Sequence, residues 1–190
     1  MRLASRGSVM LPRVAYWLMP SDRGRPPFQK MINTLANTYG APVFEPHVTI
    51  FVGERSDNES LGDVIEEATA GMEGVWLRID RIGHTSDFTK TLFVQFHPSH
   101  RLSALSDALR QRLAKPSDYV LDPHLSLIYH SMSEAEKEKV AASLIIPEPN
   151  IYFDEVRAIA TPISVRDRQD VESWKLLYRK RLEAVESSPR

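Results

Sequence analysis

The chain has 190 residues, with 24 Lys or Arg and 25 Asp or Glu, for a formal net charge of −1. This length favours one compact domain, and the near-neutral charge argues against binding of duplex DNA by bulk electrostatics. The absence of cysteine excludes disulfides, thiolate metal ligands and a Cys nucleophile, and fits a reducing compartment such as the cytoplasm. The longest apolar runs are too short to cross a membrane, so no membrane partner is expected.

The two ends of the chain differ from the part between them. Residues 1–13 contain three arginines but no apolar core of signal-peptide length, which predicts a flexible N-terminal leader, with a transit peptide as the alternative. We expect a single domain over residues 14–181 and a flexible tail over residues 182–190. No low-complexity linker divides the chain.

The first half of the chain alternates strand-like and helix-like segments. A short apolar run predicts a strand over residues 14–19, and helical spacing predicts a helix over 28–39 that ends at Gly40. β-branched residues then predict a strand over 47–53. A second helix is expected over 61–72, followed by an alternating strand over 75–82.

The second half continues in the same manner. A strand over residues 91–96 is expected to pair with the preceding strand as a hairpin, and helical spacing predicts a helix over 102–113. A strand over 123–129 comes next. Ser133 and Glu136 match a capping box, which predicts a helix that continues to about residue 144. Strands over 151–160 and 171–178, joined by the charged stretch 166–170, complete an α+β fold with helices outside.

Two hexapeptides share one form. Residues 45–50 (EPHVTI) and 122–127 (DPHLSL) each read acid, Pro, His, aliphatic, hydroxyl, aliphatic. A single histidine followed by a hydroxyl residue two positions later means little, because Ser and Thr are common. Two copies that also match at four flanking positions are far less expected by chance, so the repeat predicts a function.

Strand geometry gives the repeat a physical meaning. Alternate side chains of a strand point to opposite faces, so His47 and Thr49 share one face and the aliphatic residues take the other. The same holds for His124 and Ser126 in the second copy. If a pseudo-twofold relates the two halves, the two His–hydroxyl pairs face one another across a cleft.

Two opposed imidazoles suit hydrolysis of a cyclic phosphodiester. A neutral histidine takes a proton from the attacking water, and a protonated one gives a proton to the departing ribose oxygen. A pKa of about 6.5 allows both forms near neutral pH. Thr49 and Ser126 would donate hydrogen bonds to non-bridging phosphate oxygens. This chemistry predicts an enzyme that uses general acid–base catalysis, and no cofactor is expected.

The two motifs, His47-x-Thr49 and His124-x-Ser126, resemble the paired motifs of the 2H phosphoesterase superfamily. Residues 16–20, 44–49 and 123–129 resemble its cyclic phosphodiesterase branch more than its RNA ligase-like branch. The resemblance implies a bilobal α+β fold, in which two antiparallel β-sheets related by a pseudo-twofold face a central cleft with helices on the outside.

The resemblance also implies an activity. Members of this branch hydrolyse nucleoside 2′,3′-cyclic phosphates or ADP-ribose 1″,2″-cyclic phosphate without a metal, so a small cyclic nucleotide is the expected partner. By the same likeness His124 would be the base that activates water, and His47 the acid.

Three aromatic residues are further candidates for substrate binding. Tyr129 matches an active-site tyrosine of the branch, but its odd offset from His124 places it on the wrong face unless the strand bulges or ends before it. Trp17 is expected to stack on a base. Phe88 is the single aromatic residue of the segment 85–91, where the branch carries a mobile aromatic loop.

Two other functions remain open. An RNA-end phosphodiesterase or 2′-5′ RNA ligase-like enzyme would act on RNA termini and would need a basic groove, against which the net charge speaks. A non-catalytic nucleotide- or RNA-binding module would keep the site without turnover. A monomer is expected in each case. His97 and His100 lie in a loop that leads into a helix, with no nearby carboxylate to complete a metal site.

Overall fold

The computed structural model describes residues 13–54, 60–113 and 117–184. Most of the predicted leader and of the predicted tail, residues 1–12 and 185–190, lies outside the described residues. Arg13 already belongs to the first strand, and Leu182 is buried against the core. The fold therefore reaches slightly beyond both boundaries that the sequence predicts for the domain.

Strands and helices follow one another in an order that repeats. The first half contains β1 (Arg13–Pro20), α1 (Arg25–Tyr39), β2 (Val48–Glu54), α2 (Leu61–Ala68) and β3 (Val75–His84). After a short 3-10 turn, η1 (Phe88–Lys90), the second half contains β4 (Leu92–Phe96), α3 (His100–Arg112), β5 (His124–Ile128), α4 (Glu134–Ser143) and β6 (Asn150–Thr161). The chain then adds α5 (Arg168–Glu172) and β7 (Lys175–Arg181).

All described strands belong to one sheet in the order β1-β2-β5-β4-β3-β6-β7, with β1 also paired to β6, and all pairings are antiparallel. Exchanging β1 with β4, β2 with β5 and β3 with β6 leaves every pairing among these six strands unchanged. The strand order thus has the pseudo-twofold form that was expected. The β2–β5 junction on its axis consists of one residue pair, Val48 and Leu125.

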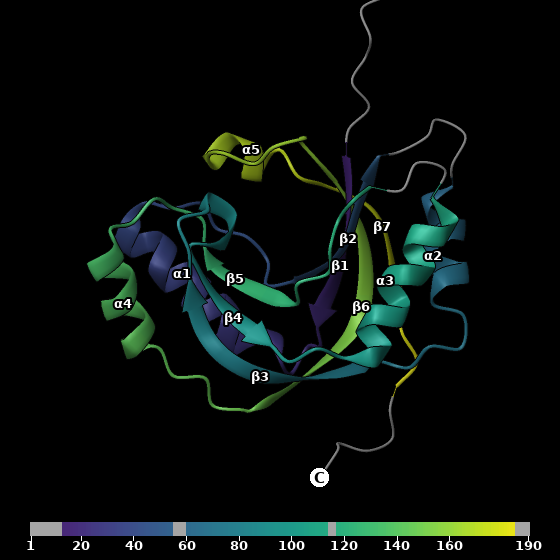
Figure 1. Cartoon of the computed structure of the whole chain (residues 1–190), viewed down its shortest axis with the longest axis horizontal. Coiled ribbons are helices and arrows are strands. Elements are labelled where there is room, and N and C mark those ends of the chain that lie inside the picture. Colours follow the sequence, from purple (N-terminus) through teal and green to yellow (C-terminus); the bar gives the residue numbers. More distant parts are fainter. Residues whose placement is uncertain (1–12, 55–59, 114–116, 185–190) are drawn as a thin grey trace, which may run out of the picture.

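The prediction of an α+β protein with antiparallel strands is confirmed. The two expected sheets are joined into one, because the long strand β6 pairs with β3 at its start and with β1 and β7 farther along. The sheet is bent, with α1 and α4 outside one side of the bend and α2 and α3 outside the other (Figure 1). We call the face turned away from these four helices the inner face.

One helix from each half packs against a strand of the other half. Helix α1 follows β1 but packs on β5, and α3 follows β4 but packs on β2. Their apolar stripes meet the aliphatic residues of the two hexapeptides, which are fully buried in the main core: Val48, Ile50, Leu125 and Leu127. The predicted burial of these aliphatic residues under helices is confirmed, and it turns both histidines toward the inner face.

Several predicted boundaries are confirmed by their caps. Gly40 ends α1 with φ of 65°, a conformation that costs glycine little. Ser133 and Glu136 form the predicted capping box at the start of α4. The predicted strand over residues 171–178 is wrong in its first part, because Asp167 caps the short helix α5 and β7 starts only at Lys175.

Candidate active site

The β2–β5 junction brings the two hexapeptides together. Val48 pairs with Leu125 between antiparallel strands, and in this register His47 lies across from Ser126 and Thr49 across from His124. The two histidines are then diagonal neighbours, a relation in which side chains lie roughly 7–8 Å apart. The structure therefore places all four motif residues around a single residue pair on the inner face.

Each histidine ring is held by a hydrogen bond to the main-chain carbonyl oxygen two residues before it. His47 Nδ1 lies 2.7 Å from the carbonyl oxygen of Glu45, and His124 Nδ1 lies 2.7 Å from the carbonyl oxygen of Asp122. A carbonyl oxygen only accepts, so each Nδ1 carries the hydrogen and each neutral ring keeps its lone pair on Nε2. The two rings thus present equivalent nitrogen atoms for proton transfer.

The surroundings of the two rings differ. His47 is buried and stacks on Trp17, with ring centroids 3.6 Å apart and planes 12° apart. The ring of His124 meets Phe93 edge-on at 5.6 Å, and its side chain keeps 20% of its exposure. The His47 ring is therefore shielded from solvent, whereas water can reach the His124 ring.

Burial lowers the pKa of both histidines. For His47 desolvation lowers the pKa from 6.5 to about 4, the hydrogen bond to the Glu45 carbonyl acts against this, and the charges of His124 and Arg157 lower the pKa further. The pKa of His124 is also lowered, first by desolvation and then by the charge of Lys90, while Asp122 acts against this. Both rings are therefore mainly neutral at pH 7 in the free protein, and His47 holds its proton less readily.

The two hydroxyl residues are placed as the strand alternation predicts, but they are engaged differently. Thr49 is half-buried on β2, and Ser126 is buried on β5. The Ser126 hydroxyl donates a 2.7 Å hydrogen bond to the carbonyl oxygen of Thr89 in η1. A phosphate role for Ser126 thus requires its hydrogen to turn away from Thr89.

Tyr129 reaches the inner face because the strand both ends before it and has an irregular register, the two possibilities that the sequence left open. Strand β5 ends at Ile128, and the β4–β5 register shifts so that Leu127 has no partner. Tyr129 is buried, and its side chain lies within hydrogen-bonding reach of Ser126. Burial raises the pKa of its hydroxyl, which keeps it protonated.

An aromatic cluster covers His47. Phe44 and Tyr129 stack at 4.1 Å, and Phe88 lies 6.2 Å from Tyr129. Trp174, which follows α5, makes edge contacts with Trp17 at 5.0 Å and His47 at 6.0 Å. Helix α5 lies at the open side of the bend (Figure 1).

Two of these placements bear on the sequence predictions. Phe88 joins the cluster through its contact with Tyr129, and its predicted role in substrate binding stays a prediction. Trp17 is only 5% exposed, and one of its faces is covered by the His47 ring. The structure therefore gives Trp17 a contact with the histidine, and its predicted stacking on a base stays a prediction.

Sequence reasoning missed Trp174 and the charged residues beside the histidines. Trp174 was assigned to the interior of a strand, and Arg157 and Lys90 carried no motif. Both cations pair with the acid that opens a hexapeptide: Arg157 with Glu45 at 2.6 Å, and Lys90 with Asp122. Only the repeated acid of the two hexapeptides could have indicated that such partners exist.

The described residues offer neither a metal site nor a membrane-spanning helix. No group of three or more His, Cys, Asp or Glu side chains there could hold a metal ion, and none of the helices there is long and apolar enough to span a membrane. Ser99 caps α3 as its position suggested, so His100 is the first residue of that helix and does not lie in the loop. The expectation that no carboxylate lies near these histidines is wrong for His97, whose Nε2 is 3.8 Å from Asp80 Oδ1. The expected metal independence, monomeric state and cytoplasmic location stay predictions.

Comparison with known proteins identifies the relatives of this site. The family model for cyclic phosphodiesterase-like proteins matches residues 10–182. The chain belongs to this family. It therefore also belongs to the 2H phosphoesterase superfamily that the two motifs predict, a superfamily of phosphoesterases.

Similar proteins agree with this membership. The cyclic phosphodiesterase of Arabidopsis thaliana is 24% identical over 161 residues, which cover 84% of this chain and 89% of that protein. A crystal structure of Escherichia coli LigT with 3′-AMP aligns with a TM-score of 0.57 at 19% identity, over 90% of this chain and 98% of that one. A Thermus thermophilus protein aligns with a TM-score of 0.60 at 13% identity over the same shares. These structures support the fold assignment.

Proposed function

We propose that this family member hydrolyses cyclic phosphodiesters of small nucleotides, either nucleoside 2′,3′-cyclic phosphates or ADP-ribose 1″,2″-cyclic phosphate, without a metal. The observation that carries the proposal is the pair of Nδ1-anchored imidazoles, His47 and His124, with Nε2 unprotonated in both neutral rings. They come from equivalent strands and lie diagonally across one residue pair. In-line displacement at phosphorus needs groups on opposite sides of the phosphorus atom, which this arrangement can supply.

His124 acts as the base in this proposal. Its ring is the more exposed of the two, so water can reach it, and its lowered pKa keeps Nε2 unprotonated near neutral pH. Nε2 takes a proton from water as the water oxygen bonds to phosphorus. The bond from phosphorus to one ribose oxygen then breaks.

His47 acts as the acid and protonates that departing ribose oxygen. In the free protein its pKa of about 4 leaves it mainly neutral at pH 7. A bound phosphodiester anion lowers the electrostatic cost of a charge on the ring and raises its pKa. Because a proton held at low pKa is readily given up, a protonated His47 in its dry site is an effective donor.

Thr49, Ser126 and Tyr129 complete the proposed site. They share the inner face with the histidines, and their hydroxyl groups would donate hydrogen bonds to the non-bridging oxygens, whose charge rises in the transition state. Phe88 and Trp17 would contact the nucleoside. A small nucleotide is supported by the LigT crystal structures, which contain 3′-AMP, NADP+ or ATP.

The experiment that tests this proposal is a substrate panel monitored by phosphorus NMR in the presence of EDTA. We expect turnover of 2′,3′-cyclic AMP or ADP-ribose 1″,2″-cyclic phosphate to a single phosphomonoester isomer, with no loss on chelation. A preference for a cyclic-ended oligoribonucleotide would favour the RNA-end alternative. Tight binding of a 2′-nucleotide without hydrolysis of any substrate would favour the non-catalytic module and contradict the proposal.

A further inference from the structure

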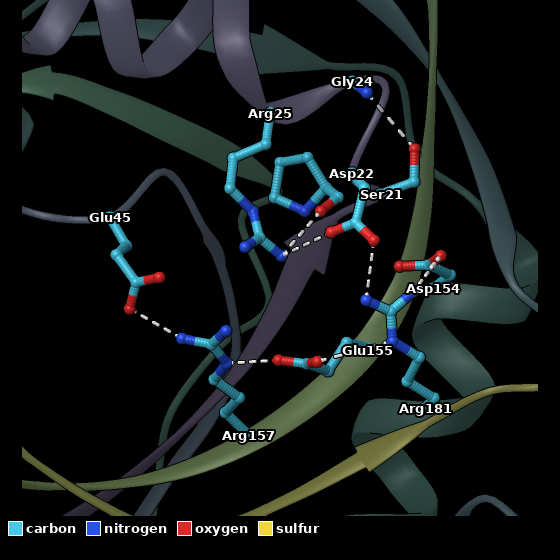
Figure 2. Close-up of polar contacts among 10 residues, drawn as sticks. Ser21, Asp22, Gly24, Arg25, Glu45, Asp154, Glu155, Arg157 and Arg181 are labelled. Atoms are coloured by element: carbon cyan, nitrogen blue, oxygen red, sulfur yellow. Dashed lines mark hydrogen bonds and ion pairs between the residues drawn. The ribbon is translucent and has the colours of Figure 1, made fainter.

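A line of alternating acidic and guanidinium groups runs from Glu45 through Arg157 and Glu155 to Arg181 (Figure 2). The Arg157 Nη1 atom lies 2.6 Å from Glu45 Oε2, and Arg157 Nε donates to Glu155. Arg181 on β7 lies 3.9 Å from Glu155 and 2.8 Å from Asp22. Arg157 therefore links the first hexapeptide to a strand far away in the sequence.

Arg157 is unusual in being a buried cation on the inner face. Its side chain is 8% exposed and that of Glu155 is 5% exposed. In the β1–β6 register Arg157 pairs with Trp17, so the two side chains leave the sheet on the same face. Burying two charges is costly, and the pair is therefore weak evidence for a purely stabilising role.

Glu45 connects this cation to the histidine. The Glu45 carboxylate binds Arg157, while the main-chain carbonyl of the same residue accepts the hydrogen of His47 Nδ1. Without Arg157 the Glu45 side chain, which is 51% exposed, would have no charged partner among the described residues. Two attachments on one residue fix the orientation of the peptide group that the imidazole uses.

The second half performs the same task with different residues. Asp122 supplies the carbonyl for His124 Nδ1, and its carboxylate binds Lys90 and accepts a 2.9 Å hydrogen bond from Gln95. A lysine from η1 and an amide from β4 thus replace the β6 arginine. Because different residues bind the acidic side chain in each half, we infer that fixing this acid is important for the orientation of the neighbouring histidine.

We propose that Arg157 is a positioning residue for His47: it holds Glu45 so that the Glu45 carbonyl keeps the His47 ring in its Nδ1–H tautomer with Nε2 toward the substrate. The catalytic consequence rests on the proposed function, whereas the effect on the ring does not. The charges that act on His47 in the described structure are those of His124 and Arg157, and the main-chain carbonyl of Glu45 binds its Nδ1.

The test measures the tautomer and the pKa of His47 by nitrogen NMR in the ligand-free protein. Arg157→Met combined with Glu155→Gln removes the cation without leaving a buried charge unpaired. We expect a growing Nε2–H population at His47, because the Glu45 carbonyl is then held less firmly, with no change at His124. Arg157→Lys should restore the tautomer only in part, because an ammonium group lacks the planar fork.

Two further variants keep the test decisive. Glu45→Gln alters a half-exposed side chain, so it should leave the fold intact and still mix the His47 tautomers. Lys90→Met is the matched control in the other half, and it should raise the pKa of His124 while leaving His47 unchanged. A His47 tautomer that is unchanged in both the Glu45 and Arg157 variants would overturn the proposal.

Turnover gives a second readout. On the substrate found by the panel, we expect kcat to fall roughly 10- to 100-fold in the Arg157→Met, Glu155→Gln variant with little change in KM, and Arg157→Lys to lie between it and the wild type. If the wild type hydrolyses nothing, the proposed function fails and the NMR result still decides the role of Arg157. An unchanged kcat in an active enzyme would refute the positioning role.

Discussion

The two halves of the molecule share a backbone but differ in what surrounds their histidines. Both have a register shift opposite the same hexapeptide position, and both hold Nδ1 at 2.7 Å from a carbonyl oxygen. Around His47 the neighbours are aromatic and dry, whereas Asp122, Lys90 and Gln95 surround His124. The repeated backbone thus determines where the two imidazoles lie, and their different side-chain environments separate their pKa values.

Residues at equivalent positions of the two halves show how their side chains differ. Trp17 pairs with Thr49 as Phe93 pairs with Ser126, so the two aromatic residues correspond. On the next strand Trp17 pairs with Arg157, whereas Phe93 pairs with Gly83. The Phe93 ring fills the space that a side chain would need there, and a Cβ on Gly83 would lie 2.6 Å from its Cζ atom.

The largest expected effect follows from what the halves share. His47→Gln and His124→Gln should each lower kcat/KM by at least ~10²-fold, because each removes one proton transfer. Steady-state kinetics on the accepted cyclic nucleotide measures this, and circular dichroism checks the fold. His100→Gln, at the exposed start of α3, is the matched control and should keep full activity. Near-normal turnover in either catalytic variant would contradict the two-histidine mechanism.

The next effect distinguishes the two histidines by how much each contributes to the loss of protein stability at low pH. The folded state holds the pKa of His47 at about 4 against 6.5 for the ordinary group, so between these values the unfolded chain binds more protons. Stability should therefore fall as the pH drops from 6.5 to 4, and His47 contributes about 3 kcal/mol to this loss.

Urea unfolding of wild type and variants at several pH values isolates this contribution. His47→Gln should remove most of its share of the pH dependence, and His124→Gln should remove less, because its pKa is lowered less. Equal effects of the two substitutions would show that the environments of the two rings do not differ as described.

The smallest expected effect concerns Gly83, which occupies the position in the second half that Arg157 occupies in the first. Gly83→Ala should destabilise the fold by about 1–3 kcal/mol, since the Phe93 ring has to move from its packed position. Because Phe93 touches His124, turnover should fall while the pKa of His47 stays unchanged. Urea unfolding and His47 NMR measure the two effects, and an unaltered stability would argue against this packing.

Much of the site could be predicted from the sequence, because strand periodicity is local. The hexapeptide repeat alone indicated that His47, Thr49, His124 and Ser126 share a face, and the structure confirms that face. It left Tyr129 undecided, because a bulge depends on a register between strands that the alternation of one strand does not contain.

The remaining parts depend on contacts between distant segments. Arg157 lies in an ordinary strand pattern, and its proposed role depends on a contact with Glu45 across β1. Trp174 lies between α5 and β7, in a stretch whose apolar spacing resembled a strand. The merging of two sheets into one also followed from pairings of β6 that composition does not encode.

A crystal structure with a bound 2′-nucleotide product tests the central claim most directly. We expect Nε2 of His47 and Nε2 of His124 each to lie within hydrogen-bonding distance of the same phosphate group, on opposite sides of its phosphorus atom. A phosphate bound away from the β2–β5 junction, or touched by only one of the two rings, would contradict it.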